Sequence, residues 1–295
     1  MMLGWHRGSE TMRSLRELCR RFDPFVAIDF SEDTVRIVSS RSAGGGGENP
    51  TIYSFRYDKN YLKADEYGAQ VRAALRDRFA HCLIGLPTSE ALVMTIAIPS
   101  DVAWKNYTSV HQWALSQVPL DESCISVAID VHALKGTPFK VASIAALKRT
   151  RLEWFHSIAD SAGLTVERMT LRQCALVHVS GLSSTPGQCG IQVIIDTDEY
   201  RSPAHIFYDT KWLASWEALG AGAPEGFTIS QVRERLTALG IASDEPITVS
   251  QIGEGLQSVR CSQVGKDLGH VIFTPTSLEK DLYALGLVAL GKSDS

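Results

Sequence analysis

The chain has 295 residues, of which 44% are hydrophobic and 21% charged, and its formal net charge is -4. This composition is typical of a folded protein with one large domain or two medium ones, and it argues against disorder. The negative charge argues against nonspecific binding of nucleic acid, which needs a basic surface, so we expect no nucleic-acid partner. No signal peptide and no run of about 18 apolar residues is recognisable, so we expect a cytoplasmic protein.

Residues 1–24 form a basic amphipathic segment. Within residues 1–22 five arginines stand against two glutamates, a charge of 5 - 2 = +3, and apolar residues are interleaved with them. Such a segment could be an arm that contacts an anionic membrane surface, or a helix that packs on its own domain with a solvated basic face. Both interpretations remain open at this point.

The first half of the chain alternates between strand and helix patterns. Residues 25–40 have strand composition on both sides of a polar turn, which predicts a β-hairpin, and residues 51–57 predict a third strand. Further along, the apolar periodicity predicts the order helix, two strands, helix, two strands, helix, strand and helix. A pattern of this kind is typical of a mixed α/β protein.

The second half repeats the opening theme. Residues 191–209 are again an apolar strand that ends in an aspartate, followed by a polar turn and a second strand. Residues 211–219 continue this meander, and a helix at 229–240, a buried strand at 246–253 and a closing helical segment at 277–291 follow. Two halves that each begin with strand, aspartate, turn and strand predict an internal duplication.

No catalytic or metal-ligating set stands out. The eight histidines lack metal-ligand or acid–base spacing, and the six cysteines contain no C-x-x-C pair, so we expect no metal site and mostly buried, unpaired cysteines. "GLVALGKS" (286–293) matches a phosphate-loop pattern, but the two residues after it leave no room for the helix that such a loop requires. Hairpin turns after Asp29 and Asp196 could instead bind phosphate through amides while the aspartates position Mg²⁺.

Several stretches carry motifs in a fixed order. They are "AIDFSEDTVRIVSS" (27–40), "IGLPTSEALVMTIAIP" (84–99), "WALSQVPLDESCISVAIDVH" (113–132), "VIIDTDEY" (193–200) and "YALGLVALG" (283–291). They resemble the first phosphate hairpin, the L-P-x-S motif, the I-P-F-x-L-D-E motif, the second phosphate hairpin and the closing A-x-G-L-A-L of one family. That family is the PilM group of type IV pilus assembly proteins, with its competence and HofM-like relatives, within the actin-like ATPase superfamily and more distantly related to FtsA.

The resemblance implies an α/β actin-like fold, which is a duplicated RNase H-like fold, with an inserted α+β subdomain of the FtsA and PilM type. It implies three regions: an N-terminal arm (1–24), a first half (25–190) with the insertion at about 87–168, and a second half (191–295) with a shortened lid at about 220–246. A shortened lid would exclude water poorly from a nucleotide cleft.

By the same resemblance, a nucleotide cleft would be lined by Asp29, Ser31, Arg36, Asp196, Asp198, Gly220 and Gly253. Ser31 and Asp198 replace glycines of the two phosphate turns, and a carboxylate at 198 would repel phosphate. Gln251 and Ile252 would fill space that glycines leave for the base. We therefore expect a pseudo-ATPase without a cofactor, and not an enzyme, with an active ATPase that uses ATP and Mg²⁺ as the alternative. Asp29 and Asp196 could also simply cap their turns.

Proteins of the PilM group bind the cytoplasmic N-terminal tail of PilN, an inner-membrane protein, so the resemblance implies a scaffold of a type IV pilus, competence or type II secretion complex. We expect an extended peptide held by main-chain pairing in a groove beside the inserted subdomain. The groove would be lined by Gly85, Leu86, Pro87, Ser143, Ile144, Ala145 and Ala146, with a helix at 169–180 as a wall. The arm would bring the protein to the inner membrane. A filament-forming protein like FtsA is a further alternative.

Overall fold

The computed structural model describes residues 25–31, 33–40, 51–58, 63–75, 81–134, 140–178, 191–196, 204–208, 211–216, 229–241, 247–252 and 271–275. The chain divides into two compact units. Unit 1 consists of Met1–Glu90, Arg149–Ser183 and Asp281–Ser295, and unit 2 consists of Ala91–Lys148 and Ser184–Lys280. No helix in the described part of the chain has the length and hydrophobicity needed to cross a bilayer.

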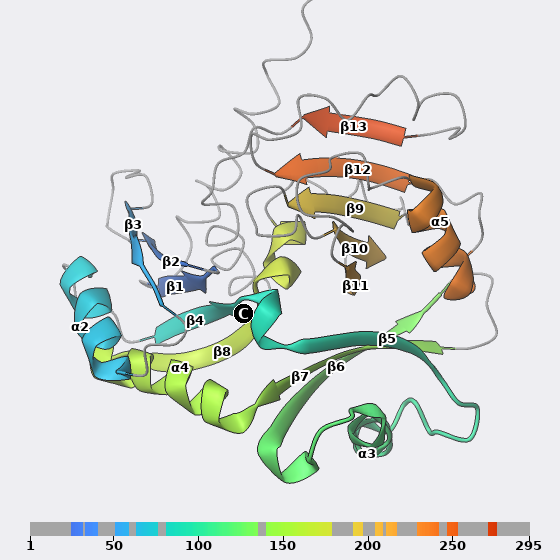
Figure 1. Ribbon diagram of the computed structural model, residues 1–295, viewed down its shortest axis with the longest axis horizontal. Coiled ribbons are helices and arrows are strands. Elements are labelled where there is room, and N and C mark those ends of the chain that lie inside the picture. Colours follow the sequence, from blue (N-terminus) through green and yellow to red (C-terminus); the bar gives the residue numbers. More distant parts are fainter. Residues whose placement is uncertain are drawn as a thin grey trace, which may run out of the picture. The chain divides into compact units, whose positions relative to one another are not determined.

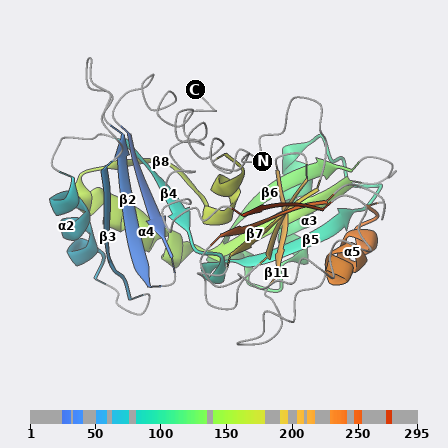
Figure 2. The same cartoon turned by 90° about the horizontal axis from the view of Figure 1, so that it is seen from above.

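A five-stranded mixed sheet forms the centre of unit 1, in the order β3-β2-β1-β4-β8 (Figure 1). Its strands are β1 (Phe25–Phe30), β2 (Thr34–Ser40), β3 (Thr51–Arg56), β4 (His81–Leu86) and β8 (Thr165–Leu171). The first three form an antiparallel meander, seen in blue in Figure 2, whereas β4 runs parallel to both β1 and β8. The hairpin and the third strand predicted from the sequence are confirmed.

Two helices, α2 (Ala64–Ala74) and α4 (Arg149–Ala162), pack against each other in unit 1, and α4 also contacts β8 (Figure 1). The buried residues of α4 recur at helical spacing and include Trp154 and Phe155. The Phe155 ring lies 4.8 Å from the ring of Phe30 on β1, which joins the helix layer to the sheet. Gly163 follows α4 with a φ of 77° and ends the helix, because glycine adopts this left-handed conformation without strain.

The two helices approach each other closely at Gly68 of α2. A Cβ atom at this position would lie 2.4 Å from Cβ of Ser161 and 2.7 Å from the carbonyl oxygen of Ile158, both on α4. Real Cβ atoms do not come this close to such neighbours, since interiors are packed at van der Waals contact. The glycine is therefore what lets the helices meet at this distance.

The chain leaves unit 1 after Glu90 and returns to it at Arg149. Near these two points, Arg151 donates from Nε to Oε2 of Glu90 at 2.9 Å and from Nη2 to Oε1 at 2.8 Å. The Arg151 guanidinium also donates to the hydroxyl of Tyr57 and lies 4.2 Å from the ring centroid of Trp154. One arginine thus ties the departing and the returning segment to the core of unit 1.

Unit 2 contains a second five-stranded sheet, in the order β11-β10-β9-β12-β13. Its strands are β9 (Ile191–Asp196), β10 (Ala204–Tyr208), β11 (Lys211–Trp216), β12 (Ile247–Ile252) and β13 (Val271–Pro275), and the unit also holds helix α5 (Ile229–Ala238). The strands β9, β10 and β11 are antiparallel, and β12 is parallel to β9 and β13. Strand for strand this repeats the pairing in unit 1, which confirms the predicted duplication.

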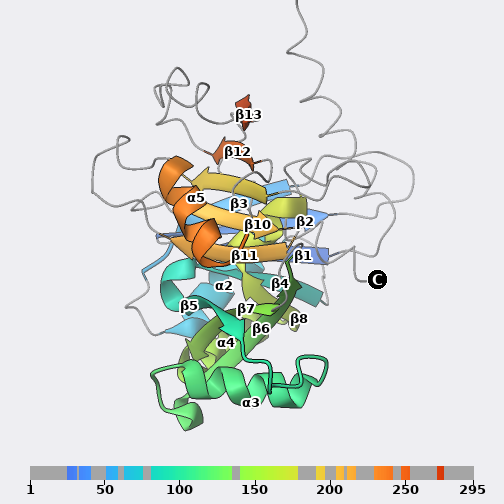
Figure 3. The ribbon, with the colours of Figure 1, turned by 90° about the vertical axis from the view of Figure 1, so that its right-hand side faces the viewer.

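Three further strands of unit 2 form a separate antiparallel sheet in the order β5-β7-β6. They are β5 (Leu92–Ile98), β6 (Ile125–Ala133) and β7 (Lys140–Lys148). Helix α3 (Tyr107–Gln117) covers one face, against Ile144 and its neighbours (Figure 3). Because side chains alternate along a strand, Ser143 points to the opposite face, where β11 contacts all three strands.

These units divide the chain at different places from the expected domains. The three-stranded sheet and its helix span residues 92–148, which is less than the expected insertion of about 87–168, because α4 and β8 belong to unit 1 and β8 pairs with β4. Residues 92–148 group with the second five-stranded sheet. The expected arm (1–24) and much of the expected lid (220–246) lie outside the described residues, although α5 falls within the latter range.

Candidate functional site

A buried ion pair lies near the end of β1 in unit 1. The Asp29 side chain is 0% exposed, and Arg172 donates to it from Nε to Oδ1 at 3.0 Å and from Nη2 to Oδ2 at 3.2 Å. Arg172 is itself only 2% exposed, and Nη1 of Arg36 lies 3.6 Å from Oδ2 of Asp29. A carboxylate gripped by both nitrogens of a guanidinium fork is fully compensated in charge, so this one needs no added cation.

The parallel strands of unit 1 explain how residues so far apart in sequence meet. The carboxyl ends of β1, β4 and β8 lie at the same edge of the sheet; Asp29 is in register with Gly85, and Gly85 with Thr170. Arg172 follows directly after β8, at the start of the 3₁₀ helix η3 (Arg172–His178). The backbones of β1 and β8 are two strand spacings apart, or about 10 Å. Gly85 on the strand between them has no side chain that would separate Asp29 from Arg172.

Ser31 holds the turn between β1 and β2. Its Oγ donates to the carbonyl oxygen of Thr34 at 2.9 Å and accepts from the N–H of Thr34 at 3.1 Å. The backbone N–H of Ser31 donates to the same carbonyl oxygen at 2.8 Å. The turn is therefore capped by Ser31, while the partners of Asp29 are arginines and not turn amides.

The other residues expected in the nucleotide cleft belong to unit 2. Asp196 is the last residue of β9, and Gln251 and Ile252 end β12, but the side chains of all three lie outside the described part of the structure. Asp198, Gly220 and Gly253 also lie outside the described residues. Their roles in the cleft stay predictions.

No metal-binding cluster of three or more His, Cys, Asp or Glu side chains occurs in the part of the chain that the structure describes. Cys82 and Cys124 are free thiols. Burial raises the pKa of Cys82 to about 12, which makes it an unreactive packing residue. Cys124 is exposed, so the expectation of buried cysteines is wrong for that position.

The residues expected in the partner groove are distributed over both units. Gly85, Leu86 and Pro87 are buried at the end of β4 in unit 1. Ser143–Ala146 lie in β7, which is the middle strand of its sheet and pairs with β5 on one edge and β6 on the other. Residues 143–146 therefore have no free backbone edge for main-chain pairing with a partner peptide, and a contact through their side chains stays a prediction. The expected helix at 169–180 is strand as far as Leu171 and then η3.

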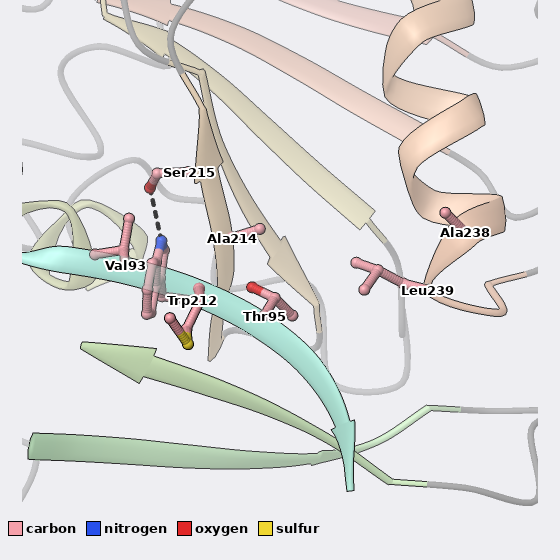
Figure 4. A pocket seen from close by; sticks show the side chains of 8 residues that line it. Val93, Thr95, Trp212, Ala214, Ser215, Ala238 and Leu239 are labelled. Carbon is pink, nitrogen blue, oxygen red and sulfur yellow. Dashed lines mark hydrogen bonds between the residues drawn. The ribbon is translucent and has the colours of Figure 1, made fainter. Parts of the chain in front are cut away.

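A pocket of about 310 Å³ lies in unit 2 beside β5 (Figure 4). It is lined by Val93, Met94 and Thr95 from β5, Trp212, Ala214 and Ser215 from β11, and Ala238 and Leu239 at the end of α5. Consecutive side chains of a strand point to opposite faces. A pocket that is lined by three consecutive residues of β5 therefore extends along the edge of this strand. β5 is an edge strand of its sheet, and none of the lining residues is charged. The site therefore suits an uncharged, extended segment.

Two side-chain hydroxyl groups bond to the backbone of β11 near this pocket. The register between β10 and β11 shifts between Ile206 and Phe207, which leaves Leu213 as a bulge residue. Its carbonyl oxygen accepts from Oγ1 of Thr95 at 2.7 Å and from Oγ of Ser143 at 2.5 Å. Hydroxyl groups of β5 and β7 thus fasten the three-stranded sheet to β11 at this carbonyl.

His132 of β6 completes this hydrogen-bond chain, with Nε2 at 2.8 Å from Oγ of Ser143. Ser143 donates its only hydroxyl proton to the carbonyl oxygen of Leu213, so its Oγ can only accept from His132. Nε2 of His132 therefore carries a proton and donates it to Oγ of Ser143. Burial lowers the pKa of His132 to about 4, Lys211 acts in the same direction, and Asp130 and the backbone of Trp212 act against it. The ring is therefore neutral at pH 7.

We expect His132 to make unit 2 less stable in mild acid. Its pKa is about 4 in the folded protein and 6.5 in an unfolded chain, so between these values only the unfolded state takes up the proton. Stability then falls as the pH falls through this window, by about 2 kcal/mol between pH 7 and pH 5. Urea denaturation at both pH values measures this loss. His132→Gln keeps an N–H donor without titrating and should lose correspondingly less; an equal loss in both proteins would contradict the assignment.

No family model matches the chain, and no curated protein matches it in sequence. Solved structures do match in fold. The PilM–PilN type IV pilus biogenesis complex matches with 12% identity, 91% of this chain and 97% of that chain covered, and a TM-score of 0.59. The cytoplasmic domain of EpsL, an inner membrane component of the type II secretion system of Vibrio cholerae, matches with 10% identity, 92% and 94% covered, and a TM-score of 0.52.

A third structure, a Bacteroides thetaiotaomicron protein of unknown function with an actin-like ATPase fold, matches with 11% identity, 89% of this chain and 95% of that chain covered, and a TM-score of 0.54. Together with the duplicated mixed sheets, these similarities confirm the α/β actin-like fold expected from the sequence. At such identities the likeness concerns the fold.

Proposed function

We propose that this protein is a non-catalytic scaffold of the PilM and HofM-like kind, in the inner-membrane assembly complex of a type IV pilus, competence or type II secretion machine. The support is the fold that it shares with PilM of the PilM–PilN complex and with the cytoplasmic domain of EpsL. In this role it lies in the cytoplasm at the inner membrane and binds the cytoplasmic tail of a PilN-like protein. The N-terminal arm would add contact with the membrane.

The buried pair of Asp29 and Arg172 is the observation that carries the non-catalytic part of this proposal. The resemblance gives the aspartate of the first hairpin the task of positioning Mg²⁺, but here both of its oxygens accept hydrogen bonds from Arg172. A metal ion could take this place only if Arg172 moved and left a buried guanidinium without its partner, which costs several kcal/mol. Asp29 and Arg172 therefore do not fit Mg²⁺ at the first hairpin, and an active ATPase is the less favoured alternative.

Within unit 2, β5 is the place for main-chain pairing with a partner tail. Among the described strands, β5 pairs with β7 on one edge only, whereas β7 pairs on both edges. An extended tail that adds a strand to β5 would place alternate side chains in the uncharged pocket between β5, β11 and α5. This moves the proposed contact by one strand from Ser143–Ala146.

Isothermal titration tests the proposal, with a synthetic peptide of the cytoplasmic tail of a PilN-like protein encoded beside this gene. We expect the peptide to bind and Mg-ATP alone to give no heat. Val93→Asp puts a charge into the pocket and should weaken peptide binding by about tenfold or more. Leu92→Asp is the matched control, because Leu92 lies on the same strand, is exposed and does not line the pocket. Equal effects of both variants would refute the β5 site, and micromolar binding of Mg-ATP would refute the pseudo-ATPase.

A further inference from the structure

One end of the three-stranded sheet carries exposed aromatic and basic side chains. β5 ends at Ile98, which is in register with Lys140 at the start of β7, and Lys140 is in register with Ala133 at the end of β6. The loop from β5 to α3 leaves from this end of the sheet (Figure 1). We refer to residues 99–107 together with Ala133, Leu134 and Lys140 as the tip.

Two large aromatic side chains of the tip are exposed. Trp104 is 41% exposed and Tyr107 is 68% exposed. The loop that carries Trp104 is held in place by hydrogen bonds from Val102 N–H to the carbonyl oxygen of Pro99 at 3.1 Å and from Asn106 N–H to that of Ala103 at 2.8 Å. The indole is thus presented outward by an ordered turn, and its exposure is a property of the fold.

Two lysines flank the exposed indole. The Nζ atoms of Lys105 and Lys140 lie 5.3 Å and 5.0 Å from the ring centroid of Trp104. The described residues of the tip contain these two lysines against Asp101, a charge of 2 - 1 = +1, whereas the whole chain has a net charge of -4. The tip is therefore more basic than the chain as a whole, and its lysines lie beside the exposed indole.

We propose that the tip docks on an anionic membrane surface. Trp and Tyr rings settle at the level of lipid headgroups because they have an apolar body and a polar edge, and lysines beside them are attracted by lipid phosphates. A bilayer interface accommodates the exposed rings and the two lysines together, and an acidic protein surface is the alternative that the test separates from it. This contact is separate from the N-terminal arm and does not depend on the proposed partner.

Cosedimentation of the full chain with vesicles tests the proposal. We expect binding to vesicles with about one third phosphatidylglycerol in phosphatidylcholine, and little binding to phosphatidylcholine alone. Lys105→Glu/Lys140→Glu should weaken binding by about tenfold or more, because each lysine contributes about 1 kcal/mol near an anionic surface. Lys63→Glu/Lys148→Glu is the matched control: both lysines are exposed, lie outside the tip, and change the net charge by the same amount.

Quenching of tryptophan fluorescence by bromine-labelled lipids locates the contact. We expect quenching in the wild-type protein and its loss in Trp104→Phe. Quenching that is instead lost in Trp5→Phe would assign the contact to the N-terminal arm and overturn the proposal. Equal weakening by the two lysine double variants would do the same, since it would show an effect of net charge alone. Binding of polyglutamate at the tip without binding of vesicles would point to an acidic protein and would also overturn it.

Discussion

Arg172→Met should lower the free energy of unfolding by about 4 kcal/mol, the largest effect that we expect for a single substitution in this protein. The variant leaves the carboxylate of Asp29 at 0% exposure without its two hydrogen bonds from Arg172. Arg36, at 3.6 Å from Oδ2, compensates only in part, because it makes no close bidentate contact. Urea denaturation followed by circular dichroism measures the loss.

A double variant separates the role of the ion pair from that of side-chain packing. Asp29→Leu/Arg172→Met removes both charges and should be clearly more stable than Arg172→Met alone, since replacing a whole buried pair by apolar groups is often close to neutral. Arg168→Met on β8, the strand that precedes Arg172, serves as the control; Arg168 is exposed, so its loss should cost about 0.5 kcal/mol or less. Wild-type stability in Arg172→Met would show that the pair does not hold unit 1 together.

Gly68→Ala should lower the free energy of unfolding by about 3 kcal/mol. The new methyl group would lie 2.4 Å from Cβ of Ser161 and 2.7 Å from the carbonyl oxygen of Ile158, so α2 and α4 would have to move apart. Thermal unfolding measures the effect, and a fall in the melting temperature of Gly68→Ala would support the close approach of the two helices. Helix propensity alone predicts that alanine stabilises an exposed helix position by about 1 kcal/mol over glycine, so a rise in the melting temperature would contradict the close approach.

Removing the opposing atom gives an independent check on the same contact. Ser161→Gly in the Gly68→Ala background takes away the Cβ atom at 2.4 Å, while the carbonyl oxygen of Ile158 remains at 2.7 Å. We therefore expect a partial recovery of stability. A double variant less stable than Gly68→Ala by the full cost of a helical glycine, with no recovery, would show that Ser161 is not the obstacle.

The duplicated strand order could be predicted because its signals are local. Each half begins with a short apolar run, an aspartate and a polar turn, and these features specify hairpins without knowledge of the rest of the chain. The pairing of β1, β2 and β3 and of β9, β10 and β11 follows from them. The same local signals set the order of helices and strands that follows the first hairpin, which the structure confirms.

Arg172 could not be found in the same way. It lies 143 positions from Asp29, and the two meet only because β4 and β8 add to the sheet beyond β1 in parallel. A single sequence does not reveal this strand order, and an arginine after a strand has no recognisable motif. The position of Gly85 on β4, between the strands that carry Asp29 and precede Arg172, likewise depends on the strand order and is not evident from the sequence.

The position of β7 as the middle strand of its sheet is indicated by the sequence. Residues 141–147 are a continuous run of apolar and small residues, as expected for a strand that is buried on both faces, whereas β6 alternates between buried and exposed positions. That contrast predicts a middle strand, which offers no free edge to a peptide. For Gly68 no such signal exists, because the contact depends on how two helices happen to cross.

The tie between Arg151 and Glu90 has a consequence for how this chain can change. Residues 91–148 depart from and rejoin the first unit at one anchored spot, so the host sheet is complete without them. A segment whose two ends are already held together can be replaced by a longer or shorter segment at little entropic cost, because the entropy lost on closing a loop depends only weakly on its length. The point where residues 91–148 leave and rejoin the first unit can therefore accept segments of different length, provided that a replacement also supplies the hydroxyl groups that bond Leu213 of β11.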